Sequence, residues 1–407
     1  MMRARQLEVK VQHIGKSRPK RNRIMLVLGI VFIAAALRAP FTSVGTLIEM
    51  IQADLGLSNV LAGAITTLPL LAFALVSPFA SKLARRYGMA NVLLISMLLL
   101  AVGILVRSGA GTGLLFIGTA ILGISIAVCN VLLPGLIKGK FPRKIGLMTG
   151  LYTVSMNLCA ALAAGISVPL ASHSGLGWRG TLAMWFVLAG LATLLWIPQI
   201  RVLGIASVSS KSSSTTNMWR SSLAWQISFF MGLQSLLYYV LIAWFSVILG
   251  ERGMSSSHAG WILSLMQLAQ LPFTFFVPLF AGRLKNQRSL VGITFILYII
   301  GVGGLWLGSN AWMAVWAISI GIAGGFSFGL VMMFFNLRTK TTQEAAELSG
   351  MAQSVGYLLA ASGPAVFGWL HDLTDSWDLP LLLLLVVSVL LLFVGMGAGS
   401  NRFVGDK

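Results

Sequence analysis

One arginine stands inside a long apolar segment near the start of the chain. Arg38 follows IVFIAAAL, and a guanidinium at mid-bilayer costs about 2.5–3.5 kcal/mol on insertion scales, so some interaction must offset that cost. Thr42, Gly45, Thr46 and Glu49 recur at helical spacing and form one polar stripe with it. Glu49 is eleven residues further on, a helical rise of about 16 Å, which is too far to neutralise Arg38. The stripe therefore predicts a watery cavity where the planar fork of Arg38 meets an anionic or strongly dipolar ligand.

The alternative is an arginine that backbone carbonyls hold for structural reasons alone. The remaining polar side chains away from the ends of the apolar segments are uncharged, and two pairs, Gln234 with Tyr238 and Gln353 with Tyr357, are four residues apart and share a helix face. Hydrogen bonding between helices is the competing explanation for each of them. The predicted substrate-binding residues are Arg38, Thr42, Asn130, Tyr152, Gln234, Tyr238, Gln353 and Tyr357.

The acidic residues are informative because none falls in the middle of an apolar segment. An embedded carboxylate is the usual proton carrier in membrane pumps and transporters. Glu49, at the end of the polar stripe, is therefore the candidate for coupling to a proton. The four histidines have no metal-ligand spacing, and no glycine-rich phosphate loop is present, so we expect no metal, no cofactor and no enzymatic activity.

These side chains must be positioned by helices in a lipid bilayer. The chain has 407 residues, of which 57% are hydrophobic and only 10% charged, whereas soluble domains have about 25% charged residues. A spanning helix needs about 20 mostly apolar residues, and twelve such segments are present. They are 24–51, 58–81, 90–108, 113–137, 146–171, 179–198, 223–250, 257–281, 289–307, 311–336, 347–370 and 379–399.

The basic residues predict the orientation of these helices. Of the 29 lysines and arginines, 25 fall in the two termini, the middle connection and the loops on one side of a twelve-helix count. Positive residues accumulate on the cytoplasmic side of membrane proteins, so we expect both termini to be cytoplasmic. The net charge of +19 is then a consequence of topology, and nucleic acid is not an expected partner.

A weak internal repeat, displaced by about 200 residues, suggests two parallel halves. GLYTVSMNLCAALAAG (150–165) resembles GMAQSVGYLLAASGP (350–364), with Gly150 matching Gly350. Chance similarity between apolar helices is the rival explanation. A ligand site between such halves lies near mid-membrane. The predicted organisation is a basic cytoplasmic tail (1–23), a six-helix bundle (24–198), a serine-rich cytoplasmic linker (199–222), a second six-helix bundle (223–399) and a short cytoplasmic tail (400–407).

Four segments resemble the cyanate and 2-nitroimidazole transporter family of the major facilitator superfamily, and the 2-nitroimidazole branch most closely. They are ALRAPFTSVGTL (36–47), TTLPLLAFAL (66–75), NVLLPGLIKGKFP (130–142) and SGMAQSVGYLLAASGP (349–364). The resemblance covers nearly the whole chain. One departure is Arg85, which stands where the superfamily usually has an acidic residue in the loop between the second and third helices.

The resemblance implies an all-α membrane protein with twelve transmembrane helices in two pseudo-symmetric bundles. It also implies secondary transport by alternating access in the bacterial inner membrane. The implied substrate is a small polar or anionic molecule such as cyanate, or a 2-nitroimidazole that is exported. We expect a monomer to be functional in the lipid bilayer. The alternative function is a membrane sensor that binds a ligand without moving it.

Overall fold

The computed structural model describes residues 20–207 and 217–406, and within these ranges all regular secondary structure is helical, without strands. The first half contains α2 (Lys20–Thr46), the short α3 (Ile48–Leu55), α4 (Asn59–Tyr87), α5 (Met89–Arg107), α6 (Thr112–Lys140), α7 (Ile145–His173) and α8 (Gly177–Ser207). The second half contains α9 (Ser222–Glu251), α10 (Ser256–Ala281), α11 (Arg288–Leu307), α12 (Met313–Leu337), α13 (Thr342–Thr374) and α14 (Asp378–Ala398).

The helix ends follow local signals in the sequence. Ser58, Ser221 and Ser255 each cap a helix by accepting a hydrogen bond from a backbone N–H of the first turn. Thr341 and Glu344 form a full capping box at the start of α13. Two helices run beyond the predicted spans: α2 already begins at Lys20, and α8 continues to Ser207, into the segment predicted as linker. Residues 1–19 of the predicted tail, 208–216 of the linker and residue 407 lie outside the described residues.

Eleven helices in the described ranges are long and apolar enough to span a membrane by composition alone. The twelfth long helix, α13, is not among them, because residues such as Ser354, Gly356 and Pro364 lower its hydropathy. α13 is 33 residues long and packs against α9 in its own half and α4 in the other. Its polar composition is therefore that of a helix between the two halves rather than one that faces lipid alone.

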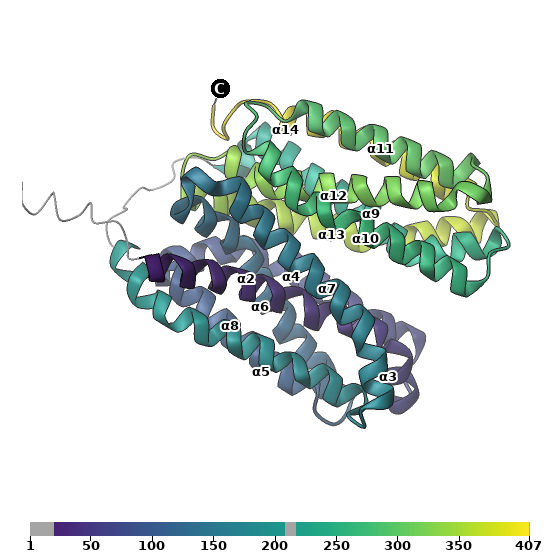
Figure 1. Cartoon of the computed structure of the whole chain (residues 1–407), viewed down its shortest axis with the longest axis horizontal. Coiled ribbons are helices and arrows are strands. Elements are labelled where there is room, and N and C mark those ends of the chain that lie inside the picture. Colours follow the sequence, from purple (N-terminus) through teal and green to yellow (C-terminus); the bar gives the residue numbers. More distant parts are fainter. Residues whose placement is uncertain (1–19, 208–216, 407) are drawn as a thin grey trace, which may run out of the picture.

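The helices form two bundles, α2 to α8 and α9 to α14, and Figure 1 shows them as the lower and upper parts of the molecule. α4 packs on α13, and α7 packs on α10, so these four helices form most of the contact between the bundles. The first described turn of α2 and the C-terminus lie at the same end of the molecule (Figure 1). Both ends of the chain lie at the same end of the molecule when the number of membrane-spanning helices is even, as predicted.

The two bundles are joined by hydrogen bonds in the part of the molecule nearest the termini. Gln343 reaches Ser81 O at 3.4 Å, and Lys138 Nζ reaches Asn336 O at 2.5 Å. Closer to the middle, Thr153 Oγ1 donates to Thr274 O and Ser354 Oγ to Ala74 O, both at 2.5 Å. Towards the opposite end the bundles diverge (Figure 1). The structure is thus closed at the end that carries the termini.

An ion pair at this closed end involves the unusual Arg85. Its Nη1 lies 3.5 Å from Glu347 Oε1 on α13, so a base on α4 faces an acid across the bundles. The Arg85 side chain is 58% exposed, and exposed pairs of this kind contribute little to stability. The superfamily's acidic position is therefore occupied here by the basic partner of an inter-bundle pair.

The orientation in the membrane is tested by cysteine labelling in sealed cells. With both termini cytoplasmic, single cysteines within 371–378 should react with a membrane-impermeant thiol reagent. Cysteines within 217–222 should stay unreacted until the cells are opened. Rapid labelling of 217–222 in sealed cells would contradict the predicted orientation.

Candidate functional site

A small cavity lies between the two bundles, near the middle of the molecule. Its walls come from α2 and α7 in the first half and from α9, α10, α12 and α13 in the second. The free volume at its centre is about 20 Å³, enough for about one water molecule. The lining residues are Arg38, Asn157, Gln234, Ser235, Tyr238, Tyr239, Gln270, Gly324, Phe328 and Tyr357.

Arg38 is the one charged residue among these lining residues. Among the described residues no carboxylate lies within ion-pair distance of its guanidinium. Instead it interacts electrostatically with three tyrosines of the other bundle, Tyr238, Tyr239 and Tyr357. Hydroxyl groups stabilise a cation by their dipoles but leave its net charge uncompensated. The cavity is therefore positively charged and offers a group that an anion can pair with.

Two further polar atoms beside Arg38 lack partners. Asn157 Nδ2 and Tyr239 Oη are both buried and make no hydrogen bond among the described residues. Tyr239 lies close enough to Arg38 for the two side chains to interact, and a guanidinium can only donate in such a contact. A buried polar group without a partner costs about 1–3 kcal/mol. A ligand with acceptor atoms would remove that cost, because Asn157 supplies N–H donors and Tyr239 an O–H donor.

The cavity brings together four of the eight predicted substrate-binding residues: Arg38, Gln234, Tyr238 and Tyr357. Gln234 is positioned by its own helix, since its Nε2 donates to Met231 O at 3.2 Å and contacts Ser235 Oγ at 2.6 Å. Tyr357 is held by Phe73 of the other bundle, with ring centroids 4.9 Å apart.

The other four predicted residues do not line this cavity. Thr42 Oγ1 donates to Arg38 O at 3.0 Å, and Gln353 Nε2 contacts Ser349 Oγ at 2.8 Å. Tyr152 Oη donates to Asn130 Oδ1 at 3.2 Å, so that pair is satisfied within the first bundle. Only the contact between Tyr152 and Asn130 joins two helices, as the alternative of hydrogen bonding between helices predicts, whereas Thr42 and Gln353 bond within their own helices.

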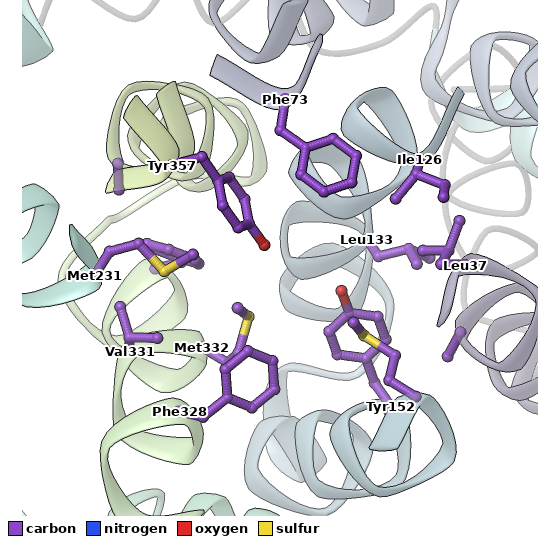
Figure 2. Close-up of a cluster of buried hydrophobic side chains, with 14 of the residues drawn as sticks. Leu37, Phe73, Ile126, Leu133, Tyr152, Met231, Phe328, Val331, Met332 and Tyr357 are labelled. Carbon is purple, nitrogen blue, oxygen red and sulfur yellow. The ribbon is translucent and has the colours of Figure 1, made fainter. Parts of the chain in front are cut away.

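Tyr152 nevertheless lies near the site. Its hydroxyl and that of Tyr357 point toward the space between the bundles in Figure 2, with Phe328 and Met332 below Tyr357. Tyr152 also interacts electrostatically with Arg38 and Tyr357. It therefore belongs to the surroundings of the cavity.

Several lining residues were not among the predicted ones. Tyr239 and Ser235 are four residues apart, as Tyr238 and Gln234 are, and the two pairs occupy adjacent strips of α9. The four-residue spacing therefore predicts the pair Ser235 and Tyr239 as well as it predicts Gln234 and Tyr238. Asn157 and Gln270 are polar residues in apolar segments, but no sequence signal distinguishes them from residues that bond to neighbouring helices.

The remaining groups of interest lie outside the cavity. Glu49, the coupling candidate, is exposed in the first turn of α3, whereas Arg38, Thr42 and Thr46 of the same stripe are partly buried. The described ranges contain no group of three or more His, Cys, Asp or Glu residues that could hold a metal ion.

Comparison with known proteins agrees with this architecture. The family model of the Major Facilitator Superfamily matches residues 26–361. The proton:xylose symporter XylE, solved with 6-bromo-6-deoxy-D-glucose, superimposes with a TM-score of 0.75 at 12% identity, covering 94% of this chain and 97% of that one. At that identity the match shows the fold alone.

Three relatives cover most of the chain. An uncharacterized transporter, YycB of Bacillus subtilis (strain 168), is 48% identical over 380 residues, 93% of this chain and 94% of its own length. The 2-nitroimidazole transporter of Escherichia coli (strain K12) is 42% identical over 383 residues, 94% of this chain and 97% of its own. The cyanate transport protein of the same organism is 28% identical over 357 residues, 86% of this chain and 91% of its own. The chain therefore belongs to the major facilitator superfamily, in the branch that contains the 2-nitroimidazole and cyanate transporters.

Proposed function

We propose that the Arg38 cavity binds a small planar monoanion, or a planar molecule with partial negative charge on its terminal atoms. The chain is a secondary transporter of small molecules and a multi-pass protein of the bacterial inner membrane. The observation that carries the substrate class is the uncompensated guanidinium of Arg38, which has no carboxylate partner among the described residues. One negative charge on the ligand would make the occupied cavity neutral, which favours movement through a low-dielectric core.

The lining chemistry restricts the ligand further. Tyr238, Tyr239 and Tyr357 present aromatic rings and hydroxyls together, an arrangement suited to a flat molecule with acceptor atoms at its edge. 2-Nitroimidazoles fit this description, and cyanate, a linear anion, presents an acceptor atom at each end; the relatives named for these two molecules make them the first candidates. For a 2-nitroimidazole the proposed direction is export. A monomer, embedded in the bilayer, is the proposed functional unit.

The deciding experiment is a flux assay with purified protein in proteoliposomes. The panel consists of cyanate, 2-nitroimidazole, other small anions and an uncharged sugar, each with and without a pH gradient. We expect flux of at least one planar anion or nitro-heterocycle above that of empty liposomes, and none of the sugar. Binding without flux would favour the alternative function, a membrane sensor.

Glu49 is the proposed coupling residue, because it is the acidic residue on the polar stripe of Arg38. Glu49→Gln is expected to reduce transport driven by a pH gradient more than replacement of any other acidic residue. The initial rate of uptake with and without the gradient measures this effect. Asp375→Asn is a matched control: Asp375 is exposed at the same end of the bundles, and its left-handed backbone (φ 46°) suits asparagine. If Glu49→Gln leaves the pH response intact, the proton is carried by the substrate.

A further inference from the structure

The closed end of the molecule contains a lysine that binds across the two bundles. Lys138 lies in the last turn of α6, within the segment NVLLPGLIKGKFP. Its Nζ donates to Asn336 O, in the last turn of α12, at 2.5 Å and to Thr339 O, just beyond the end of that helix, at 2.6 Å. Both acceptors belong to the other bundle, in residues that are only 1% exposed. The side chain therefore extends from its own helix to buried carbonyl groups at the end of α12 and just after it.

These carbonyls are a favourable site for a cation. The last four C=O groups of an α-helix have no partner within the helix, and the C-terminal end carries a partial negative charge. Glu344, at the start of α13, adds a negative charge that also acts on Lys138. Its carboxylate already accepts bonds from the backbone N–H groups of Lys340 and Thr341, so Lys138 completes a local arrangement of opposite charges.

Glycines allow α6 to approach closely enough for this contact. A Cβ atom added at Gly135 would lie 2.8 Å from Thr342 O, and one at Gly139 would lie 2.5 Å from Thr342 Oγ1. Both glycines are on α6 near Lys138, and Thr342 begins α13. The contact therefore requires the bundles to be fully closed at this end, and it is lost when they separate.

The residue that corresponds to Lys138 in the second half also caps a helix, but it does so within its own bundle. With the displacement of 200 residues that matches Gly150 to Gly350, Lys138 corresponds to Arg338. Arg338 also caps a helix, since its Nε donates to Ala398 O at 2.8 Å and its Nη2 to Gly399 O at 3.0 Å. Those acceptors lie at the end of α14, in the same bundle as Arg338. Opening the bundles leaves the Arg338 cap intact and breaks the Lys138 cap.

We propose that Lys138 sets the equilibrium of alternating access by capping α12 across the bundles, stabilising the conformation that is closed at the end carrying the termini. The proposal rests on alternating access but not on the identity of the substrate. In the opposite conformation the ammonium and the α12 carbonyls are exposed to water, which replaces the lost bonds only in part. A charge-assisted cap of this kind is expected to favour the closed end by about tenfold, equivalent to about 1.4 kcal/mol.

The test measures distances between the bundles without substrate, by pulsed electron spin resonance in lipid nanodiscs. Nitroxide labels at Lys144 and Lys285, both exposed, report on the end near the termini. Labels at His173 and His258, also exposed, report on the opposite end. Cys129 and Cys159 are first replaced by alanine. The ratio of short to long distances in each pair gives the population of the two conformations.

In Lys138→Gln the ratio should shift about tenfold towards a long 144–285 distance and a short 173–258 distance. Arg143→Gln is the matched control, because Arg143 is an exposed base close by, in the turn that follows α6. Gly139→Leu is the positive control. Its side chain would press against Thr342 and should open the end near the termini, which tests whether the assay detects opening. Unchanged populations in Lys138→Gln, or an equal shift in Arg143→Gln, would overturn the proposal. Since no ligand is added, a failure of the substrate assignment does not affect this result.

Discussion

Arg38→Ala is expected to lower ligand affinity by about 100-fold or more while the protein remains folded and inserted. Arg38 supplies the positive charge of the cavity and has no ion-pair partner among the described residues, so the ligand is its counter-charge. A hydrogen bond to a charged group contributes about 1.5–3 kcal/mol, and a planar guanidinium can make two to one ligand. Removal of a costly charge from the middle of an apolar helix does not hinder insertion.

Arg38→Lys should be impaired as well, though less than Arg38→Ala. Lysine keeps the charge but loses the planar fork that binds two acceptors at once. The lysine side chain is also shorter, so its ammonium would lie further from the tyrosine hydroxyls of the other bundle. Ligand affinity and melting temperature, measured on the same purified variants, separate loss of binding from loss of structure.

The control for both variants is Arg179→Ala. Arg179 is also an arginine of the first bundle, but it pairs with Asp54 at 3.0 Å and is 40% exposed, away from the cavity. Its replacement should leave affinity unchanged. If Arg38→Ala instead binds ligand normally and melts at a lower temperature, Arg38 is a structural residue and the cavity is not the substrate site.

The helices and their approximate ends could be predicted from the sequence because the signals are local. Apolar length sets each span, and a serine or threonine before the span sets its start, as at Ser221 and Thr341. The extension of α8 to Ser207 was missed, because the helix continues past the apolar residues that define a span. The orientation from basic residues stays a prediction.

The cavity could be predicted only in part, because a polar residue inside a helix has several possible partners. Arg38 stood out, since an arginine at that depth has few structural explanations. Asn130 and Tyr152 carried a similar polar signal, yet they bond to each other at 3.2 Å. That pairing depends on how α6 and α7 pack, which no spacing within either helix specifies. Contacts between the bundles, such as that of Thr153 with Thr274, could not be predicted from the sequence for the same reason.

Small residues give a further signal that the structure explains. Gly321, Gly325 and Gly329 recur every four residues, which predicts close helix packing. Each faces α10: an added Cβ would lie 2.0 Å from Met266 O at Gly321 and 2.6 Å from Gln270 O at Gly325. The stripe thus brings the backbones of α10 and α12 together. Since Gln270 lines the cavity, the same crossing also positions a residue of the site.

Gly321→Leu is therefore expected to prevent the native packing of the second bundle. The obstacle at Gly321 is the backbone carbonyl of Met266, which cannot turn aside as a flexible side chain could. Overpacking commonly costs about 1–3 kcal/mol and sometimes more, and here the helices themselves must move apart. We expect a fall in melting temperature of at least about 5 °C, or loss of folded protein, with Gly321→Ala intermediate. Thermal melting of detergent-purified protein, with the yield after size-exclusion chromatography, measures both.

Gly303→Leu is the matched control, because Gly303 on α11 has no atom within 4 Å of an added Cβ. It should melt close to the unmodified protein. Gly321→Ala adds a second readout: if it remains folded, displacement of α10 should also shift Gln270 and weaken ligand binding, whereas Gly303→Leu should not. A Gly321→Leu protein that melts and binds normally would show that α10 and α12 are not in close contact. In that case Gln270 would not be held at the Arg38 cavity by this crossing.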